Sequence, residues 1–373
     1  MKTFVLDISG KVPYYDHALC VELSKELEDD MCLITPYPQE IYGPSYKIKK
    51  LIRFFPEKRD TLPSVVKALE CLINYFCLLF FVAFKRDIKV LHFQWLPLLE
   101  HTSIEKSFVK IIRYFCKGKL LLTVHNVYPH DIPEEQKSYY IKRFKAVTKP
   151  FDLFITHNEA SKKQLVDEFG IEEHRVAVVP HGVFIPDFKV SKTTKNGKKR
   201  VLMFGVQSLY KGTDILINSI GELTEKERSE IDVIIAGKSD SGLYNQYKTK
   251  AEELGINWIN RFIEEEELNQ LIVDSDLVVF PYREISQSGA LLLTMYYKRA
   301  MVLSDLPAFK ETLKGYPEHF FFKSEQTTGL TNCLRSYIAG QYDLECVENI
   351  LSHLCEEYSW GNSAKTTKQL YNN

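Results

Sequence analysis

The stretch VLMFGVQSLYKGTDILINSI, residues 201–220, decides the fold that we predict for this chain. Its apolar start ends at Gly205, and the apolar residues after Gly212 recur at helical spacing, which predicts a strand, a polar turn and a helix. Such a turn aims backbone N–H groups and the positive end of a helix dipole at one point, which favours phosphate. Lys211 adds a charge there, and the two glycines let the backbone approach a ligand. The alternative is an ordinary strand–helix turn with a solvated lysine.

The rest of the second half repeats this unit. Alternating strands and helices predict a doubly wound parallel sheet with right-handed crossovers. The six predicted strands cover residues 201–204, 232–236, 257–259, 277–280, 301–304 and 320–322.

The first half predicts a second α/β domain of the same kind. We expect a loop over residues 9–15 and helices over about 18–27 and 103–116. The predicted strands lie at 2–8, 31–35, 89–95, from 120, at 153–156 and at 176–179. The domain boundaries that we predict are an N-terminal domain at 1–183, a Pro-, Lys- and Ser-rich linker at 184–200, a C-terminal domain at 201–355 and a terminal helix at 356–373.

Composition narrows the class of protein. A chain of 373 residues with 45% hydrophobic and 26% charged residues fits two globular domains. A net charge of −1 gives no overall attraction to nucleic acid, so we expect no nucleic-acid partner. The eight cysteines form no zinc-type spacing and are expected to be reduced thiols in the cytoplasm. The N-terminus is predicted to be the first strand rather than a signal peptide.

A basic region stands out against this neutral background. From Lys47 to Lys119 there are 15 Lys and Arg residues and 6 Asp and Glu residues. In KIKKLIRFFPEKR, residues 47–59, the cations alternate with apolar residues, which is typical of amphipathic segments on an anionic membrane surface. A solvated helix face is the alternative.

The apolar run at residues 69–84 is the one transmembrane candidate in the sequence. It is shorter than the roughly 20 residues of a spanning helix and contains Glu70 and Asn74. We therefore predict a buried or surface-lying helix.

Polar residues follow the strand that begins at Leu120. They are His125, Asn126, His130 and Asp131, and ligands of open parallel sheets bind outside the carboxyl ends of strands. A lone histidine is more often structural, but two histidines with Asn and Asp at one strand end favour a functional site.

Within PYREISQSGALLLTMYY, residues 281–297, a second small-residue turn, Ser286–Gln287–Ser288–Gly289, precedes a predicted helix. Two such turns on strands of one sheet would converge on a diphosphate. Asp274 and Asp276 precede the strand at 277–280, so we interpret them as structural rather than as a metal site. With helix dipoles and Lys211 to neutralise phosphates, we expect no metal and no cofactor.

The order of these motifs resembles the GT-B glycosyltransferases, in particular the bacterial glycosyl-group-1 transferases (family 4) that build surface polysaccharides. In the second half FGVQSLYKG, DVIIAG, the stretch at 260–282, SGALLL and MVLSDLPAFKE follow in the family's order. In the first half HNVYPHD and VVPHGV look like its acceptor-side loops, and YSW near the end resembles the start of its crossing helix.

The resemblance implies two Rossmann-like domains facing a cleft, with the C-terminal helix crossing back to the N-terminal domain. It implies a GDP- or UDP-sugar as donor and a hydroxyl of a glycan or polyprenol-linked oligosaccharide as acceptor. It also implies a cytoplasmic location, peripheral on the inner face of the cell membrane.

The resemblance also implies roles for individual residues. His125, Lys211 and Asp131 would be catalytic, and Gly10, Asp16, Asn126 and His181 would lie on the acceptor side; Asp16, Asp131 and His125 are the candidates for a base. The donor would contact Gly205, Lys211, Gly212, Phe262, Ile263, Glu284, Ser288, Gly289 and Ala290.

Three positions depart from the family pattern. Val206 stands where the family has arginine, and Ser286 and Thr294 stand where it has paired glutamates. Glu284 is either a substitute for one of them or a surface carboxylate. These departures leave the stereochemical outcome open, and they keep two alternatives: a nucleotide-sugar 2-epimerase of the same architecture and a non-catalytic partner protein.

Overall fold

Two parallel β-sheets organise the chain, which confirms the predicted α/β fold with two Rossmann-like sheets. The computed structural model describes residues 2–27, 30–36, 46–54, 62–129, 132–183, 185–186, 190–193, 197–285 and 288–372. Unit 1 consists of Met1–Gly182 with Ser359–Asn373, and unit 2 of Val183–Tyr358. Each unit has its own hydrophobic core.

The sheet of unit 2 has the strand order β10-β9-β8-β11-β12-β13. Its strands are β8 (Lys199–Phe204), β9 (Ile231–Ala236), β10 (Asn257–Ile259), β11 (Leu277–Phe280), β12 (Ala300–Ser304) and β13 (Phe321–Phe322). All pairings are parallel. The order reverses between β8 and β11, and ligands of open α/β sheets bind at such a reversal.

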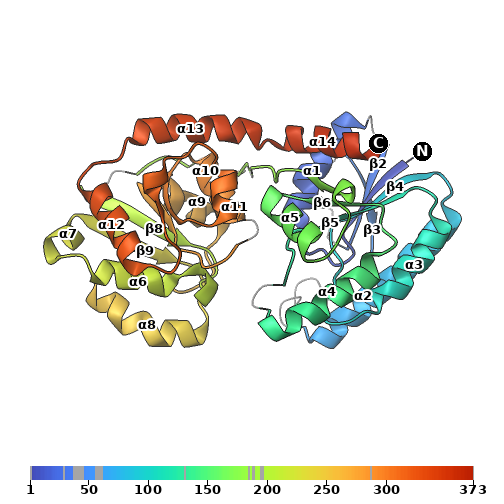
Figure 1. The fold of residues 1–373 in the computed structure, drawn as a ribbon, viewed down its shortest axis with the longest axis horizontal. Helices are drawn as coiled ribbons and strands as arrows, with labels where there is room; N and C mark the ends of the chain where they lie inside the picture. Colours follow the sequence, from blue (N-terminus) through green and yellow to red (C-terminus); the bar gives the residue numbers. More distant parts are fainter. Residues whose placement is uncertain are drawn as a thin grey trace. The chain divides into compact units, whose positions relative to one another are not determined.

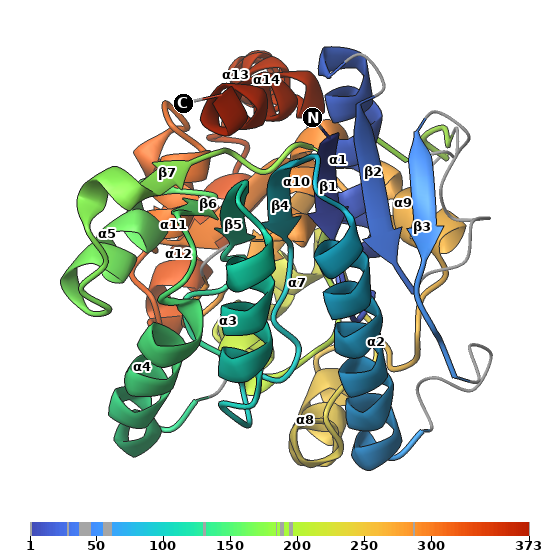
Figure 2. The same cartoon turned by 90° about the vertical axis from the view of Figure 1, so that its right-hand side faces the viewer.

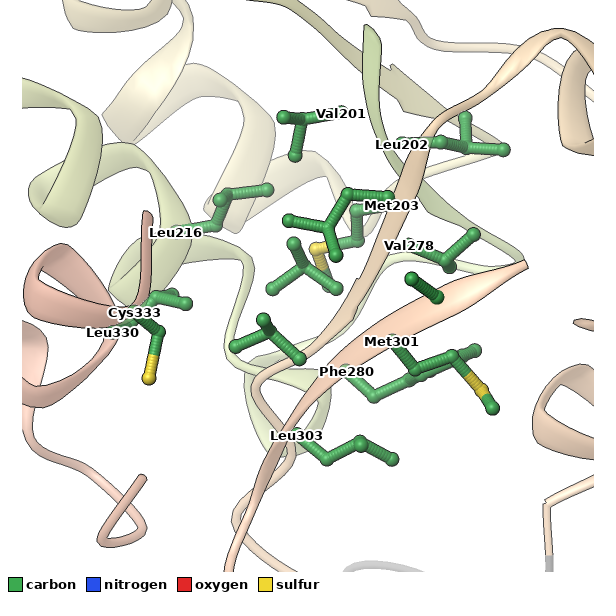
Figure 3. Packing of buried hydrophobic residues seen from close by; sticks show 14 of the residues in the cluster. Val201, Leu202, Met203, Leu216, Val278, Phe280, Met301, Leu303, Leu330 and Cys333 are labelled. Carbon is green, nitrogen blue, oxygen red and sulfur yellow. The ribbon is translucent and has the colours of Figure 1, made fainter. Parts of the chain in front are cut away.

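Helices cover both faces of this sheet (Figure 1). They are α6 (Thr213–Gly221), α7 (Glu225–Ser229), α8 (Ser241–Glu253), α9 (Glu265–Asp274), α10 (Gly289–Tyr296), α11 (Pro307–Thr312), α12 (Thr327–Ile338) and α13 (Leu344–Glu357). On one face α6 packs against α8 and α12, and on the other α10 packs against α13. Figure 3 shows the core that results: Met203 lies on the same side of the sheet as Leu216 of α6 and Leu330 of α12, while Phe280 and Met301 lie on the other side.

The sheet of unit 1 has the order β3-β2-β1-β4-β5-β6-β7, which reverses between β1 and β4. Its strands are β1 (Lys2–Leu6), β2 (Met31–Thr35), β3 (Lys47–Lys50), β4 (Ile88–Phe93), β5 (Lys119–Thr123), β6 (Leu153–Thr156) and β7 (Val176–Val178). Side chains of β4 alternate between the two faces, so that Leu91 and Phe93 enter the core under α2 and α3.

Two groups of helices flank this sheet. Its helices are α1 (Pro13–Glu26), α2 (Ser64–Phe84), α3 (Glu105–Phe115), α4 (Glu134–Thr148), α5 (Glu159–Asp167) and α14 (Trp360–Asn372). Figure 2 shows α2, α3 and α4 side by side on one face, and α14 packs against α1. The C-terminal helix therefore belongs to unit 1, where Tyr371 Oη is hydrogen-bonded to His92 Nδ1 (2.7 Å) of β4.

The first helix corrects the sequence analysis. The predicted loop at 9–15 and helix at 18–27 become a shorter loop and a helix that begins at Pro13. Proline at the first helical position has its φ already set and needs no partner for a missing N–H, so the helix begins before the apolar spacing becomes visible.

The basic segment begins with a strand. Lys47–Lys50 forms the parallel edge strand β3, paired with β2, and not the solvated helix face that was the alternative. Ile48 is partly buried while the three lysines around it are exposed, which is the period of a strand. Lysines protect an edge strand from pairing with another chain. Residues 55–59 of the segment lie outside the described residues.

The apolar run forms α2, which is 21 residues long. Among the described residues it is the one helix whose length and hydropathy would allow it to cross a membrane. One side of α2 is nevertheless bonded into unit 1. Asn74 Oδ1 accepts a hydrogen bond from Ile52 N (2.9 Å), and Glu70 Oε2 accepts one from Phe54 N (2.6 Å). The predicted surface-lying helix fits these contacts, because a spanning helix would have to break them.

A buried carboxyl group joins α2 to α3. Glu105 Oε1 accepts hydrogen bonds from Tyr75 Oη (2.6 Å) and from Leu98 N (3.1 Å). Burial raises the pKa of Glu105 to about 7, although these two hydrogen bonds lower it. The protonated form is therefore the one that the folded unit favours in mildly acidic solution.

This carboxyl group predicts a stability that depends on pH. Because the folded pKa of about 7 lies above the ordinary value of 4.5, its contribution is complete below pH 4.5 and is lost as the pH rises to 7. Glu105→Gln should remove about 3 kcal/mol of this dependence, since glutamine keeps the acceptor oxygen and does not titrate. Denaturant unfolding at pH 5 and pH 7.5 measures the difference. The exposed Glu135→Gln is the control, and a parallel pH dependence in both variants would contradict the assignment.

Candidate active site

Two turns of unit 2 lie against each other where the strand order reverses. One follows β8 and runs from Gly205 to Gly212; the other follows β11 and begins at Pro281. Arg283 N donates to Tyr210 O (2.7 Å), so the two turns are joined through their backbones. The first expected phosphate turn is therefore joined to the segment that leads from β11 toward α10, while Ser286 and Gln287 of the second expected turn lie outside the described residues.

The glycines make this approach possible. Gly212 has a φ of 72°, and a Cβ atom on it would lie 1.9 Å from Pro281 O. Gly205 has a φ of 96°, and its Cβ would lie 2.8 Å from Lys211 Nζ. We predicted that both glycines let a ligand approach the backbone. In the structure, the absent side chain of Gly212 allows the close approach of the neighbouring turn.

Arg283 fastens the two turns together. Its Nη1 and Nη2 donate to Asp214 Oδ1 (2.9 Å) and Oδ2 (2.7 Å) in a fork, and Nη1 also donates to Leu209 O. Asp214 lies in the first turn of α6, so the fork bridges that helix and the turn after β11. The sequence analysis did not assign a role to this pair. Its only signal was an arginine directly after the strand and Pro281–Tyr282, which does not disclose the partner.

The side chain of Lys211 is half-buried. Its Nζ lies 5.5 Å from the centre of the Tyr282 ring, and within the described residues it has no ion pair. Burial lowers the pKa of Lys211 to about 8. An anion beside Nζ would reverse this cost, because a neighbouring negative charge favours the charged amine.

The helix N-termini that follow the two turns are capped differently. Gly212 precedes α6 and has no side chain to cap it. Ser288 Oγ accepts from Leu291 N (3.2 Å) at the start of α10, so this predicted donor contact is partly used as a cap. Gly289 is exposed and Ala290 half-buried in the first turn of α10, where backbone N–H groups point outward from the helix end.

The other predicted donor residues lie at the surface of unit 2. Phe262 is 70% exposed, Ile263 packs partly against the core, and Glu284 is exposed. Val206, in place of the family's arginine, is exposed as well. Thr294 is buried and donates to Ala290 O (2.9 Å) within its own helix, so it offers no hydroxyl to a ligand. Ser286 lies outside the described residues.

In unit 1 a cluster of rings surrounds Tyr15 of α1. Tyr15 lies 4.6 Å from His125, 5.4 Å from His157 and 5.0 Å from His181, measured between ring centres. These histidines follow β5, β6 and β7 in turn, and Trp360 of α14 lies 5.1 Å from Tyr15 on another side. Of the three histidines, the sequence points to His125 and His181 but not to His157, because only the sheet order brings the strand ends together.

Hydrogen bonds determine which nitrogen of His125 is free. His157 Nδ1 lies 3.0 Å from Val179 O, and a carbonyl only accepts, so this nitrogen carries the proton. The neutral ring of His157 then accepts at Nε2 from His125 Nδ1 (3.1 Å). His125 Nε2 is consequently a lone-pair acceptor, buried and with no hydrogen-bond partner in the described part of the chain.

Burial keeps these rings neutral. Desolvation lowers the pKa of His125 well below its ordinary value, and the neighbouring His157, His181 and His92 lower it further. The same cause lowers the pKa of His157 to about 4. Trp95 stacks on His125 with ring centres 5.7 Å apart, which holds the ring in place. The arrangement can accept a hydrogen bond from a hydroxyl group at His125 Nε2.

Two carboxyl groups lie beneath the loop after β1. Asp7 accepts from the backbone N–H groups of Gly10 (2.9 Å) and Val12 (3.2 Å), which shapes that loop. Asp16 is fully buried, and burial next to Asp7 raises its pKa well above the ordinary value. A carboxyl group that keeps its proton does not suit the role of base that we considered for Asp16.

The remaining predicted residues of unit 1 are placed as follows. His181 is buried and its Nδ1 lies 2.7 Å from Gly182 O, while Asn126 is half-buried and Gly10 has a φ of 63°. His130 and Asp131 lie outside the described residues. Within the described ranges, no group of three or more His, Cys, Asp or Glu side chains is arranged to hold a metal ion.

Comparison with known proteins identifies glycosyltransferase sequences in both halves of the chain. The model of the family described as Glycosyltransferase Family 4 matches residues 44–185, and that of Glycosyl transferases group 1 matches residues 198–339. An uncharacterised glycosyltransferase of Methanocaldococcus jannaschii is 22% identical over 239 residues, which cover 58% of this chain and 59% of that protein. The match thus spans less than two-thirds of that relative.

Solved structures share the fold at low sequence identity. HepE of Anabaena, in complex with UDP and glucose, superposes with a TM-score of 0.68 at 14% identity over 100% of both chains. Sucrose-phosphate synthase of Thermosynechococcus elongatus has a TM-score of 0.72 at 14% identity, over 100% of this chain and 98% of that one. Identities this low show the arrangement of the chain, which is that of the GT-B proteins.

The Arg283–Asp214 fork predicts a stability effect. The side chains are 24% and 12% exposed, so Arg283→Ala should cost about 2 kcal/mol, less than for a fully buried pair. A double-mutant cycle with Asp214→Asn, measured by urea unfolding, should show coupling between the sites. Arg261→Ala, which breaks the exposed Arg261–Glu267 pair, is the matched control and should have little effect. Additive effects at Arg283 and Asp214 would count against the fork.

Proposed function

Because the chain belongs to the group 1 glycosyltransferases of the GT-B fold, we propose that it transfers a glycosyl group from a nucleoside diphosphate sugar to a hydroxyl group. The observation that carries the proposal is Lys211. It is a half-buried cation of lowered pKa on the turn after β8, which is joined to the turn after β11 at the strand-order reversal of unit 2. That is the arrangement expected for a site that receives a diphosphate.

The main role that we propose for this site is to stabilise negative charge on the leaving diphosphate. When the bond between the sugar and the diphosphate breaks, negative charge grows on the leaving phosphate, and donors already in place there lower the barrier. Lys211 Nζ supplies a full charge, while the N-termini of α6 and α10 supply backbone N–H groups. We propose that the reaction needs no metal ion and no cofactor, since these groups oppose the developing charge by themselves.

His125 is proposed to contact a hydroxyl of the sugar or of the acceptor. Its buried Nε2 is an acceptor whose orientation is set by His157 and Trp95. A ring with so low a pKa positions a hydroxyl better than it removes a proton.

The donor and acceptor are proposed at the level of chemical class. A UDP-sugar is supported by HepE, whose structure holds UDP, and a GDP-sugar remains the other candidate. The acceptor that we propose is a glycan or polyprenol-linked oligosaccharide in surface polysaccharide synthesis. The reaction would then take place in the cytoplasm at the inner face of the membrane.

One observation favours a second candidate, a non-catalytic protein that binds a nucleotide sugar. Thr294 stands where the family has a glutamate, and its hydroxyl is bonded within α10. A donor site that cannot hold the sugar hydroxyls would bind the nucleotide without turnover.

The transfer reaction is tested by incubating the purified chain with a panel of UDP- and GDP-sugars. We expect release of the nucleoside diphosphate, and the same rate in the presence of EDTA. Loss of release on chelation, restored by manganese or magnesium, would reject the metal-free reaction. An epimerised sugar would identify a 2-epimerase, and protection against thermal unfolding without turnover would identify the non-catalytic alternative.

Lys211 predicts how donor binding depends on pH. An anion favours the protonated amine, so the affinity for UDP or GDP should fall as the pH rises above the free pKa of about 8. We expect the Kd to increase about tenfold between pH 7.5 and 9.5. Calorimetric titration measures this change.

Variants separate Lys211 from other causes. Lys211→Met should bind weakly at both pH values, and Lys211→Arg should lose the pH dependence because arginine stays charged. The exposed Lys238→Met is the matched control. If Lys211→Met kept the affinity and the pH dependence of the original chain, Lys211 would not be the diphosphate contact.

A further inference from the structure

The outward face of α2 is a continuous apolar stripe. Phe76, Phe80 and Phe84 follow one another at intervals of four residues and are 61%, 72% and 77% exposed. Val65 and Leu69 extend the stripe toward the start of the helix and are also exposed. Residues four apart lie on one side of a helix, so a single side of α2 carries all five.

The opposite side of α2 holds the helix in unit 1. Tyr75, Leu78 and Val82 are buried in the core, and Asn74 Nδ2 donates to Ile8 O (3.3 Å) and Ile52 O (2.9 Å). The helix can therefore present its stripe outward without leaving the domain. Five large apolar residues exposed on one side of a helix form a patch of the kind that marks an interaction site.

Helix α3 continues the apolar surface. Ile111, Tyr114 and Phe115 are exposed on it, and Phe76 of α2 meets Phe108 of α3 at 5.3 Å between ring centres. Figure 2 shows the two helices side by side on the same face of the sheet. We call the exposed residues Val65, Leu69, Phe76, Phe80, Phe84, Ile111, Tyr114 and Phe115 the α2–α3 surface.

Cations border the α2–α3 surface. Arg86 follows α2, Lys106 and Lys110 lie on α3, and Lys117 follows α3; in the described part of the chain none of them has an ion pair. The carboxyl groups of the two helices are turned inward, since Glu70 and Glu105 are fully buried. Asp87, which follows Arg86, is exposed and forms an ion pair with Lys85 (2.7 Å), so cations outnumber carboxylates on the solvent side.

A groove beside α2 has the same character. It lies between β3 and the second half of α2, with Leu51, Phe80, Phe81 and Phe84 among its apolar lining. Lys49, Lys50 and Lys85 also line it, and Lys49 Nζ lies 4.0 Å from the centre of the Phe81 ring. Long cationic side chains over an apolar floor match a lipid with an anionic headgroup.

We propose that the α2–α3 surface docks on the surface of an anionic lipid bilayer, with the phenylalanines of α2 entering the interface and the lysines meeting the headgroups. Charge complementarity favours this occupant, because an apolar stripe bordered by cations, with the carboxyl groups of α2 and α3 themselves buried, is the pattern of interfacial helices. The proposal keeps the membrane contact that the sequence predicts for residues 47–59 and the neighbouring basic helices and centres it on α2 and α3, while β3 contributes the lysines of the edge strand. It is independent of the transfer reaction, because docking needs no donor.

The experiment is co-sedimentation of the full chain with vesicles of phosphatidylglycerol and phosphatidylcholine, or of phosphatidylcholine alone, over a salt series. We expect binding to the anionic vesicles that weakens with salt. Phe80→Ser with Phe84→Ser, and Lys110→Ser with Lys117→Ser, should each lower the partition at least tenfold. Leu344→Ser with Lys248→Ser, which removes exposed residues of unit 2, is the matched control and should leave the partition unchanged.

A second measurement reports the depth of docking. Phe84→Trp should be quenched by lipids brominated on their acyl chains when anionic vesicles are added. Equal binding to both vesicles, or a partition unaffected by the phenylalanine variant, would overturn the proposal. So would a dimer in sedimentation velocity that the phenylalanine variant dissociates while vesicle binding is absent, because a second copy would then cover the surface.

Discussion

The close approach of two turns in unit 2 is the constraint on which the candidate donor site depends. A backbone oxygen of Pro281 occupies the space where a Cβ of residue 212 would lie, and Arg283 holds Asp214 of the other turn in a fork. Lys211 lies on the turn after β8 and is partly shielded from water, which is why its pKa falls. A desolvated cation without an anion beside it lowers the stability of the fold. The free energy regained when an anion binds there can contribute to ligand binding and to stabilisation of the transition state.

The candidate site of unit 1 is built differently, from a cluster of uncharged histidine and aromatic rings. Each histidine follows its own strand, and α14 closes the cluster through Trp360 and the Tyr371–His92 hydrogen bond. The carbonyl of Val179 orients His157, and His157 orients His125. The return of the chain to unit 1 thus supports the site as well as the fold, because α14 covers the rings that burial keeps uncharged.

The two sides of α2 have different surroundings. Its inner side satisfies Glu70, Asn74 and Tyr75 with partners inside unit 1, while its outer side leaves phenylalanines in contact with water. Apolar area exposed over several turns is unfavourable in water and favourable at a lipid interface. A membrane-bound acceptor, if the proposed function holds, would be met by the same unit that carries His125.

The sequence by itself determined most strands of the two sheets and the turn that follows residues 201–204, since strands such as 201–204 and 277–280 are short apolar runs closed by turn residues. The spacing of apolar residues and the residue preferences of turns are local properties, so they can be recognised in the sequence. Only the tertiary structure decided that Lys47–Lys50 pairs with β2 as an edge strand, and that Arg283 meets Asp214 sixty-nine residues away. It also brought His157 to His125 and buried Asp16 beside Asp7, because strand order and burial arise from contacts between distant segments, and these contacts set hydrogen bonds and pKa values.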